Sequence, residues 1–393
     1  MAGLFDYLAW RGDIPLTADP LNEVDNLILT ELAYVDFSGV VTADWESVSL
    51  KDACARFFEK HTEEEVRADK TFMGKAPLLM KEMLSGARFS GVRLCRFINE
   101  IDQEKDLQLS AVTYLLPDGT VYVAFRGTDN TLVGWKEDFN FSFLSRTEGQ
   151  NRAAAYLNGA GEGTSAPLRV GGHSKGGNLA VYAAAFCQRQ IQERITAVYS
   201  NDGPGFRREI LDSEEYARIL PRVVSIIPDT SVIGLLLDSK SRHRVVKSSA
   251  FGIMQHDGFT WQVFRNRFES AELSAGGKAI HEALGSWLEQ MDDDERRNFT
   301  DTVFSLFAAT GKDTFSGIGD QKWKSAEAIL SYAAGIPRER QQEVLSALSR
   351  LGQIGGNTAA AFLQEWIGKK GLLEKKPGTA PAAKLPDAEP FSG

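Results

Sequence analysis

The chain has 393 residues, of which 43% are hydrophobic and 10% aromatic, which is enough for a sizeable core and excludes global disorder. Its formal net charge of −9 argues against a general nucleic-acid binder and against a broad electrostatic attraction to anionic membranes. No stretch approaches the ~20 apolar residues of a membrane span, so we expect no stable span.

The three cysteines, Cys54, Cys95 and Cys187, are widely spaced, and no Cys-x-x-Cys is present. An odd number at such spacing is typical of reduced, buried thiols in an intracellular protein, and not of a disulfide framework or a zinc site. The N-terminus has an acid where a signal peptide has basic residues, and its apolar run is short. The sequence therefore predicts a cytoplasmic protein.

Residues 1–90 form a mainly helical region in our interpretation, packed on the core. Apolar residues after Pro20 fall at helical spacing, and residues 77–84 present a second apolar helical face. We favour core packing for the second face over a lipid-facing surface. The first set is Val24, Leu27, Ile28 and Leu32.

From residue 91 the pattern predicts strands over 92–101, 107–116 and 120–126, with a turn between the last two. The third strand is almost entirely apolar, as expected for a strand covered on both faces. It leads into a turn at Gly127 and Thr128, and Thr128 can offer its backbone N–H and its hydroxyl to an oxyanion. Taken alone, these residues would be only a turn.

The motif Gly-x-Ser-x-Gly occurs as Gly172, Ser174 and Gly176, between a short apolar strand and a helix predicted over 178–190. Glycine at the outer positions lets strand and helix pack closely, which leaves the serine oxygen exposed on a strained turn. The N–H of Lys175 then lies at a helix N-terminus, where positive partial charge suits a developing oxyanion. The alternative is a glycine-rich turn with an incidental serine.

Strands alternate with helices after the motif, which predicts a mostly parallel sheet. We therefore interpret residues 91–265 as a catalytic core of the α/β class, with active groups beyond the carboxyl ends of its strands. Three apolar faces predict a helical C-terminal subdomain over 266–372. Residues 373–393, rich in Lys, Pro, Ala and Gly, predict a disordered tail.

A serine nucleophile needs a base, and five histidines are available. His61 precedes the sheet region, and His173 lies inside the motif and points away from the serine side chain. His243 lies between two arginines, which favours the surface, and His281 is in mid-helix. His256 lies in a loop after a strand, where the base of such a triad belongs.

Two acids compete to orient that base. Asp202 ends the first strand after the motif helix, and Asp229 ends the second. The second position is the usual one in α/β-hydrolases, whose chain order is Ser, acid, His, and we therefore favour Asp229. Asp202, in Asn-Asp-Gly-Pro-Gly, is equally suited to a turn that shapes the pocket wall.

The chain resembles class 3 (fungal-type) lipases of the α/β-hydrolase superfamily. The match rests on Val123–Thr128, on Trp135 and Asp138, and on Gly172–Gly177. With Asp6–Asp13 and Asn22–Asn26 included, the chain is more closely similar to a bacterial lipase-like family of unassigned function, common in gut Firmicutes.

The resemblance implies that Ser174 is the nucleophile, Asp229 the acid and His256 the base, and that Thr128 and the Lys175 N–H form the oxyanion hole. Lipases usually have leucine where this chain has Lys175. That cation could favour an anionic acyl group or point to solvent.

The sequence thus predicts a serine hydrolase that cleaves carboxylic esters through an acyl-enzyme, with no metal or organic cofactor and with a small or lipid-like acyl ester as substrate. Acyl transfer by the same triad and a non-catalytic binding protein are the alternatives. A set of apolar residues could line an acyl pocket or a lid, or belong to ordinary core. These are Phe139, Phe141, Phe143, Leu235, Leu236 and Leu237.

Overall fold

The computed structural model describes residues 2–69, 73–129, 131–312 and 337–338. An eight-stranded sheet organises this part of the chain, and its strands are ordered as they occur in the sequence. The strands are β1 (Val48–Ser49), β2 (Arg93–Asp102), β3 (Leu107–Leu115), β4 (Val121–Phe125), β5 (Leu168–His173), β6 (Ile195–Asn201), β7 (Val223–Pro228) and β8 (His243–Val246).

The sheet changes direction at β4. Strands β1 to β4 pair antiparallel, with the predicted turn at residues 117–119 joining β3 to β4, and β4 to β8 pair parallel. The carboxyl ends of β4, β5, β6 and β7 therefore lie along one edge of the sheet. The predicted mostly parallel α/β sheet flanked by helices is confirmed.

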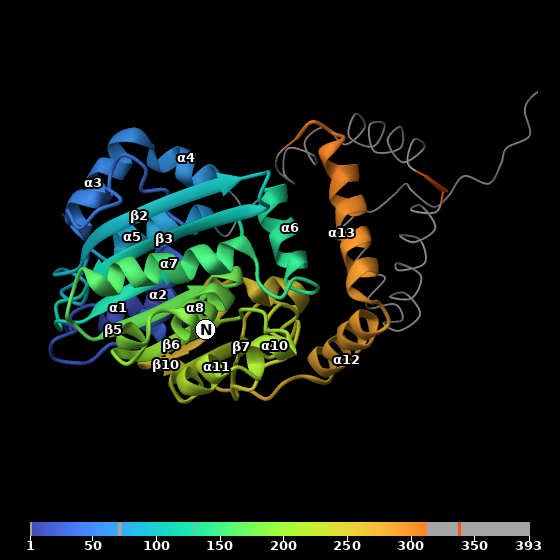
Figure 1. Cartoon of the computed structure of the whole chain (residues 1–393). Helices are drawn as coiled ribbons and strands as arrows, with labels where there is room; N and C mark the ends of the chain where they lie inside the picture. The colour runs from blue at the N-terminus through green and yellow to red at the C-terminus, as the bar shows by residue number, and fades with distance from the viewer. Residues whose placement is uncertain (1, 70–72, 130, 313–336, 339–393) are drawn as a thin grey trace, which may run out of the picture.

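Helices cover both faces of the sheet (Figure 1). One face packs in a single core cluster with the N-terminal helices, and the other packs against α7, α8 and α11. The N-terminal helices are α1 (Leu4–Arg11), α2 (Glu23–Leu32), α3 (Leu50–Lys60), α4 (Glu63–Ala68) and α5 (Ala76–Glu82). The helices between the strands are α6 (Leu132–Asn140), α7 (Glu148–Glu162), α8 (Lys175–Phe186), α9 (Arg189–Gln192), α10 (Arg208–Leu211) and α11 (Glu214–Ile219).

Helix α2 is buried almost all round. The predicted apolar residues Val24, Leu27, Ile28 and Leu32 are fully buried, but so are polar residues of the same helix. Asn22 caps its N-terminus by accepting from the N–H groups of Val24 and Asp25. The buried polar side chains are Asp25, Asn26, Thr30 and Glu31, and the apolar periodicity of the sequence does not predict their burial.

Helices α12 (Ala275–Glu289) and α13 (Asp293–Ala308) pack at the edge of the sheet where the parallel strands end (Figure 1). A small separate apolar cluster joins them to α6 and to the loop after β7. Its members are Trp287, Leu288, Met291 and Phe299, with Phe139, Leu236, Leu237 and Val303 packed against them.

Several expectations for the C-terminal region lie outside the described residues. These are the part of the predicted helical subdomain at 313–336 and 339–372 and the tail at 373–393. The division of the chain into domains remains a prediction. Within the described ranges, no helix is both long enough and apolar enough to cross a membrane.

The close approach of strand and helix at the motif generates a stability prediction. A Cβ at Gly176 would lie 2.1 Å from the backbone oxygen of Phe125, whereas a Cβ at Gly285 in α12 would meet nothing within 4 Å. Gly176→Ala should lower the free energy of unfolding by at least about 2 kcal/mol, because backbone must move. Gly285→Ala should raise it by ~0.5–1 kcal/mol. Denaturant titration measures both, and an unchanged value for Gly176→Ala would contradict the packing described.

Candidate active site

Ser174 lies on a strained turn between β5 and α8. Its φ of 58° and ψ of −132° lie in a region that residues with a side chain rarely adopt. The turn is tight because a Cβ at Gly172 would lie 2.1 Å from the backbone of Gly176. The backbone N–H of Ser174 donates to the Asn201 carbonyl at the end of β6 (2.9 Å). The predicted strand–turn–helix context of the motif is present.

The end of β4 packs directly against this turn. A Cβ at Gly127 would lie 2.6 Å from the His173 carbonyl oxygen and 2.9 Å from the Ser174 Cβ. Thr128 follows at once and is 7% exposed. The N–H of Lys175, at the first position of α8, has no partner within the helix. Thr128 and the Lys175 amide thus belong to segments that are in contact.

Asp138 of α6 holds the Thr128 hydroxyl, with 2.6 Å between Oδ2 and Oγ1. Its other oxygen, Oδ1, is buried without a hydrogen-bond partner among the described residues. Burial raises the pKa of Asp138 to about 7, although the positive charge of Lys175 and the hydrogen bond from Thr128 act in the opposite direction. This carboxyl therefore changes charge near neutral pH.

His256 ends the short 3-10 helix η3 (Gly252–His256), and its Nδ1 lies 2.7 Å from Oδ2 of Asp202. Asp202 is fully buried. Its Oδ1 accepts from the hydroxyl of Ser231 and from the N–H of Gly234 (3.1 Å). The carboxylate is thus held at both oxygens, and one of them faces the imidazole.

The prediction that Asp229 orients His256 is therefore wrong: Asp202 is the acid in contact with this imidazole. The Asp229 carboxylate accepts instead from the hydroxyl of Thr230 (2.9 Å) and the side-chain amide of Gln255 (3.0 Å). Asp202 follows β6, the neighbour of β5, whereas Asp229 follows β7, one strand further away.

The backbone of Asp202 explains how its side chain reaches the site. Its φ is +49°, a conformation that Asp and Asn adopt more readily than most residues. The signal in the sequence was Asn-Asp-Gly-Pro-Gly, which marks an unusual turn at this position.

His173 joins the His256 loop to the motif. The two imidazole rings lie 4.6 Å apart between centroids, and Nε2 of His173 lies 2.7 Å from the His256 carbonyl oxygen. A carbonyl only accepts, so Nε2 carries the proton and Nδ1 accepts from the Tyr34 hydroxyl (3.0 Å). Burial holds the pKa of His173 well below its usual value, which keeps the ring neutral.

The His256 ring therefore packs beside the residue that precedes Ser174. Within the described residues, no hydrogen bond joins the Ser174 hydroxyl to His256. Such bonds are often long or poorly aligned before substrate binds.

The other histidines lie elsewhere. His243 is half-buried, not at the surface as expected, and its Nδ1 contacts the Ser225 hydroxyl (2.8 Å). His281 contacts the Leu235 carbonyl from mid-helix (2.7 Å), and His61 is exposed and stacks on Phe57.

The side chain of Lys175 does not point to solvent, so that expectation is wrong, and its burial leaves no exposed surface for direct contact with an anionic acyl group. The side chain is completely buried, and Nζ lies 3.0 Å from Oε2 of Glu137. Nζ also donates to the backbone oxygen (2.8 Å) and the side-chain oxygen of Gln108. Only its backbone N–H remains a candidate for the oxyanion hole.

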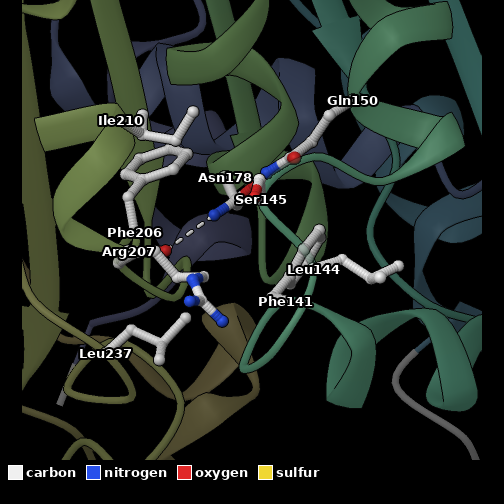
Figure 2. A pocket seen from close by; sticks show the side chains of 10 residues that line it. Phe141, Leu144, Ser145, Gln150, Asn178, Phe206, Arg207, Ile210 and Leu237 are labelled. Atoms are coloured by element: carbon white, nitrogen blue, oxygen red, sulfur yellow. Dashed lines mark hydrogen bonds between the residues drawn. The ribbon is translucent and has the colours of Figure 1, made fainter. Parts of the chain in front are cut away.

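A small hollow opens beside α8, between the loop after α6 and the segment after β6 (Figure 2). Asn178 lines it one helical turn after Ser174. Of the apolar residues predicted for an acyl pocket, Phe141 and Leu237 line the hollow, and Phe143 and Leu235 are buried. The full lining is Phe141, Leu144, Ser145, Gln150, Asn178, Gly205, Phe206, Arg207, Ile210 and Leu237.

All three cysteines are free and buried, as predicted. In the part of the chain that the structure describes, no cluster of three or more His, Cys, Asp and Glu residues could hold a metal ion.

The Mbeg1-like family model matches residues 83–305, more than half of the chain, and the chain belongs to that family. The match confirms the prediction of a lipase-like family of unassigned function. No curated protein matches the chain.

The solved structures that are similar to part of the chain include two lipases, each at 12% identity. The native propeptide complex of the Rhizomucor miehei lipase matches 44% of this chain and 70% of its own, with a TM-score of 0.33. The M37 lipase crystal structure matches 61% of this chain and 82% of its own, with a TM-score of 0.34.

Proposed function

We propose that this member of the Mbeg1-like family is a serine hydrolase that cleaves carboxylic esters of acyl groups. The observation that supports this most strongly is the pairing of His256 with the buried Asp202 beside the strained turn that presents Ser174. A serine on such a turn, an imidazole next to it and a carboxylate behind the imidazole are the groups that acyl transfer requires.

In the proposed reaction, the Ser174 oxygen attacks the ester carbonyl carbon, and His256 Nε2 takes the hydroxyl proton. Asp202 accepts a hydrogen bond from the Nδ1–H group of His256, which fixes the tautomer and stabilises the imidazolium. His256 then protonates the leaving alcohol, and the acyl group remains on Ser174. Water, deprotonated by His256, attacks the carbonyl carbon of the acyl-enzyme. The bond to the Ser174 oxygen then breaks, this oxygen takes the proton back from His256, and the carboxylic acid is released.

The negative charge on the carbonyl oxygen would be stabilised by the N–H of Lys175 and by Thr128. The Lys175 N–H lies at the start of α8, where the helix dipole adds positive potential. The Thr128 hydroxyl can donate to the oxyanion only if its hydrogen bond with Asp138 reverses, so that a protonated Asp138 donates to Oγ1. Because the pKa of Asp138 is raised to about 7, this arrangement is populated near neutral pH.

We place the acyl group against the apolar residues Phe141, Phe206 and Leu237 of the hollow one turn along α8 from Ser174, whose lining also includes the cation of Arg207 (Figure 2). The free, buried cysteines are consistent with the proposed cytoplasmic location.

The role of Ser174 can be tested directly. Ser174→Ala should lower kcat/KM for a p-nitrophenyl ester by about 10⁵-fold or more, because no acyl-enzyme can form. A fluorophosphonate should label the wild-type protein at Ser174, as the serine oxygen displaces fluoride at phosphorus. Turnover by folded Ser174→Ala, or no labelling of the wild type, would contradict the proposal and favour a non-catalytic binding protein.

The two acids can be separated by matched substitutions. Asp202→Asn should reduce kcat by about 10³-fold or more, because the amide oxygen stays with the donors Ser231 and Gly234 and the NH2 group, which cannot accept, then faces Nδ1 of His256. Asp229→Asn should leave kcat close to the wild-type value. Steady-state kinetics of both variants decides the assignment, and the reverse order of effects would restore Asp229 as the acid.

Asp138 should shape the pH profile. Its pKa of about 7 means that Asp138 is protonated below that pH and ionised above it. The hydrogen bond that protonated Asp138 donates to Thr128 Oγ1 is therefore lost as pH rises through 7, and kcat should fall. In Asp138→Asn the amide donates at every pH, and the alkaline fall in kcat should disappear.

Thr128→Val is the matched control for this experiment, because it removes the hydroxyl that Asp138 holds. We expect Thr128→Val to have a lower kcat than the wild type and no fall in kcat as pH rises through 7. An unaltered alkaline limb in both variants would show that this hydroxyl pair does not control the profile.

A further inference from the structure

Lys175 and Glu137 form a buried ion pair at the first residue of α8, and the reaction proposed above uses neither charged group. Both side chains are completely buried, with 3.0 Å between Nζ and Oε2. The two oxygens of Gln108 complete the acceptors of the ammonium group, so its three protons are all engaged. The cation is therefore not available to bind substrate.

Glu137 connects four elements around this ammonium group. Its Oε1 accepts from the N–H of Gly149 (3.0 Å) at the start of α7, and its Oε2 accepts from the N–H of Gln108 (3.1 Å) in β3. Lys175 belongs to α8, and Glu137 itself to α6. A Cβ at Gly149 would lie 2.0 Å from Oε1, so this close approach requires glycine.

Consecutive residues of α6 thus contact both candidate oxyanion donors. Glu137 holds the side chain of Lys175, whose N–H is one donor, and Asp138 holds the hydroxyl of Thr128, the other. A buried ion pair seldom stabilises a fold more than apolar residues of similar volume would. Its geometric specificity is the better explanation for its presence here.

We propose that Lys175 and Glu137 are positioning residues that set the distance between the two oxyanion donors. The pair ties the first turn of α8 to the helix that holds Thr128, so the Lys175 N–H and Thr128 keep a fixed separation. This inference rests on the proposed esterase function. Displacing one donor by about 1 Å reduces the stabilisation of the transition state more than it reduces binding of the substrate. Such a displacement lowers the rate by up to ~100-fold.

The test compares Lys175→Met and Glu137→Gln with the wild type in p-nitrophenyl butyrate hydrolysis. Each variant should lose about 10- to 100-fold in kcat with a KM within about twofold of wild type. The double variant should lose about as much as either single one, because both substitutions break the same contact.

Arg88→Met is the matched control, because it breaks another ion pair with almost no exposure, Arg88 with Asp25. It should lower the melting temperature and leave kcat unchanged. If Lys175→Met fails to fold, Glu137→Gln, which keeps the size and shape of the side chain, decides.

The outcomes separate this inference from the proposed function. If the wild type is active and Ser174→Ala is not, but both pair variants keep wild-type kcat, the positioning role is overturned and the esterase stands. The pair variants and Arg88→Met can also be compared where their melting temperatures are lowered equally. If they then lose the same amount of kcat, the pair has a structural role only, and the inference is overturned as well. If the wild type neither turns over an ester nor is labelled at Ser174, the proposed function fails and the inference falls with it.

Discussion

The site depends on the backbone contact between the end of β4 and the turn at Ser174. Glycines at 127, 172 and 176 bring these segments closer together than any Cβ would allow. This close backbone contact places Thr128 beside the first turn of α8. It also keeps Ser174 in a backbone conformation that a residue outside a folded structure would avoid. The surrounding sheet and helices must supply the stability that this strained turn lacks.

Polar residues of helix α2 and of the segment after it help to stabilise the strained turn from the sheet face that packs against the N-terminal helices. The side chains of Asn26 and Thr30 contact Asn201, which precedes Asp202, and Tyr34 contacts His173, which precedes Ser174. Oε1 of Glu31 lies 3.8 Å from Nδ1 of His173, and burial raises the pKa of Glu31 well above the usual value. The N-terminal region is therefore connected to the segments that carry the candidate nucleophile and acid.

Helix α6 has a comparable role on the other side of the turn. Its two adjacent acids contact Lys175 and Thr128, and its Phe139 packs on the apolar cluster of α12 and α13. The C-terminal helices thus contact the element next to the candidate oxyanion hole.

The sequence by itself determined the alternation of strands and helices and the strand–turn–helix at Ser174, and it indicated His256 as the candidate base. These features depend on neighbouring residues: apolar periodicity, glycines at fixed spacing, and a loop position after a strand. The apolar face of α2 was predictable for the same reason, whereas the burial of its polar residues was not.

Only the tertiary structure decided that Asp202 and not Asp229 contacts His256, and that Lys175 is buried against Glu137. Both pairings join residues that are far apart in the chain. They depend on the order of strands in the sheet, on the positive φ of Asp202 and on the path of α6, and no local sequence pattern specifies those distances.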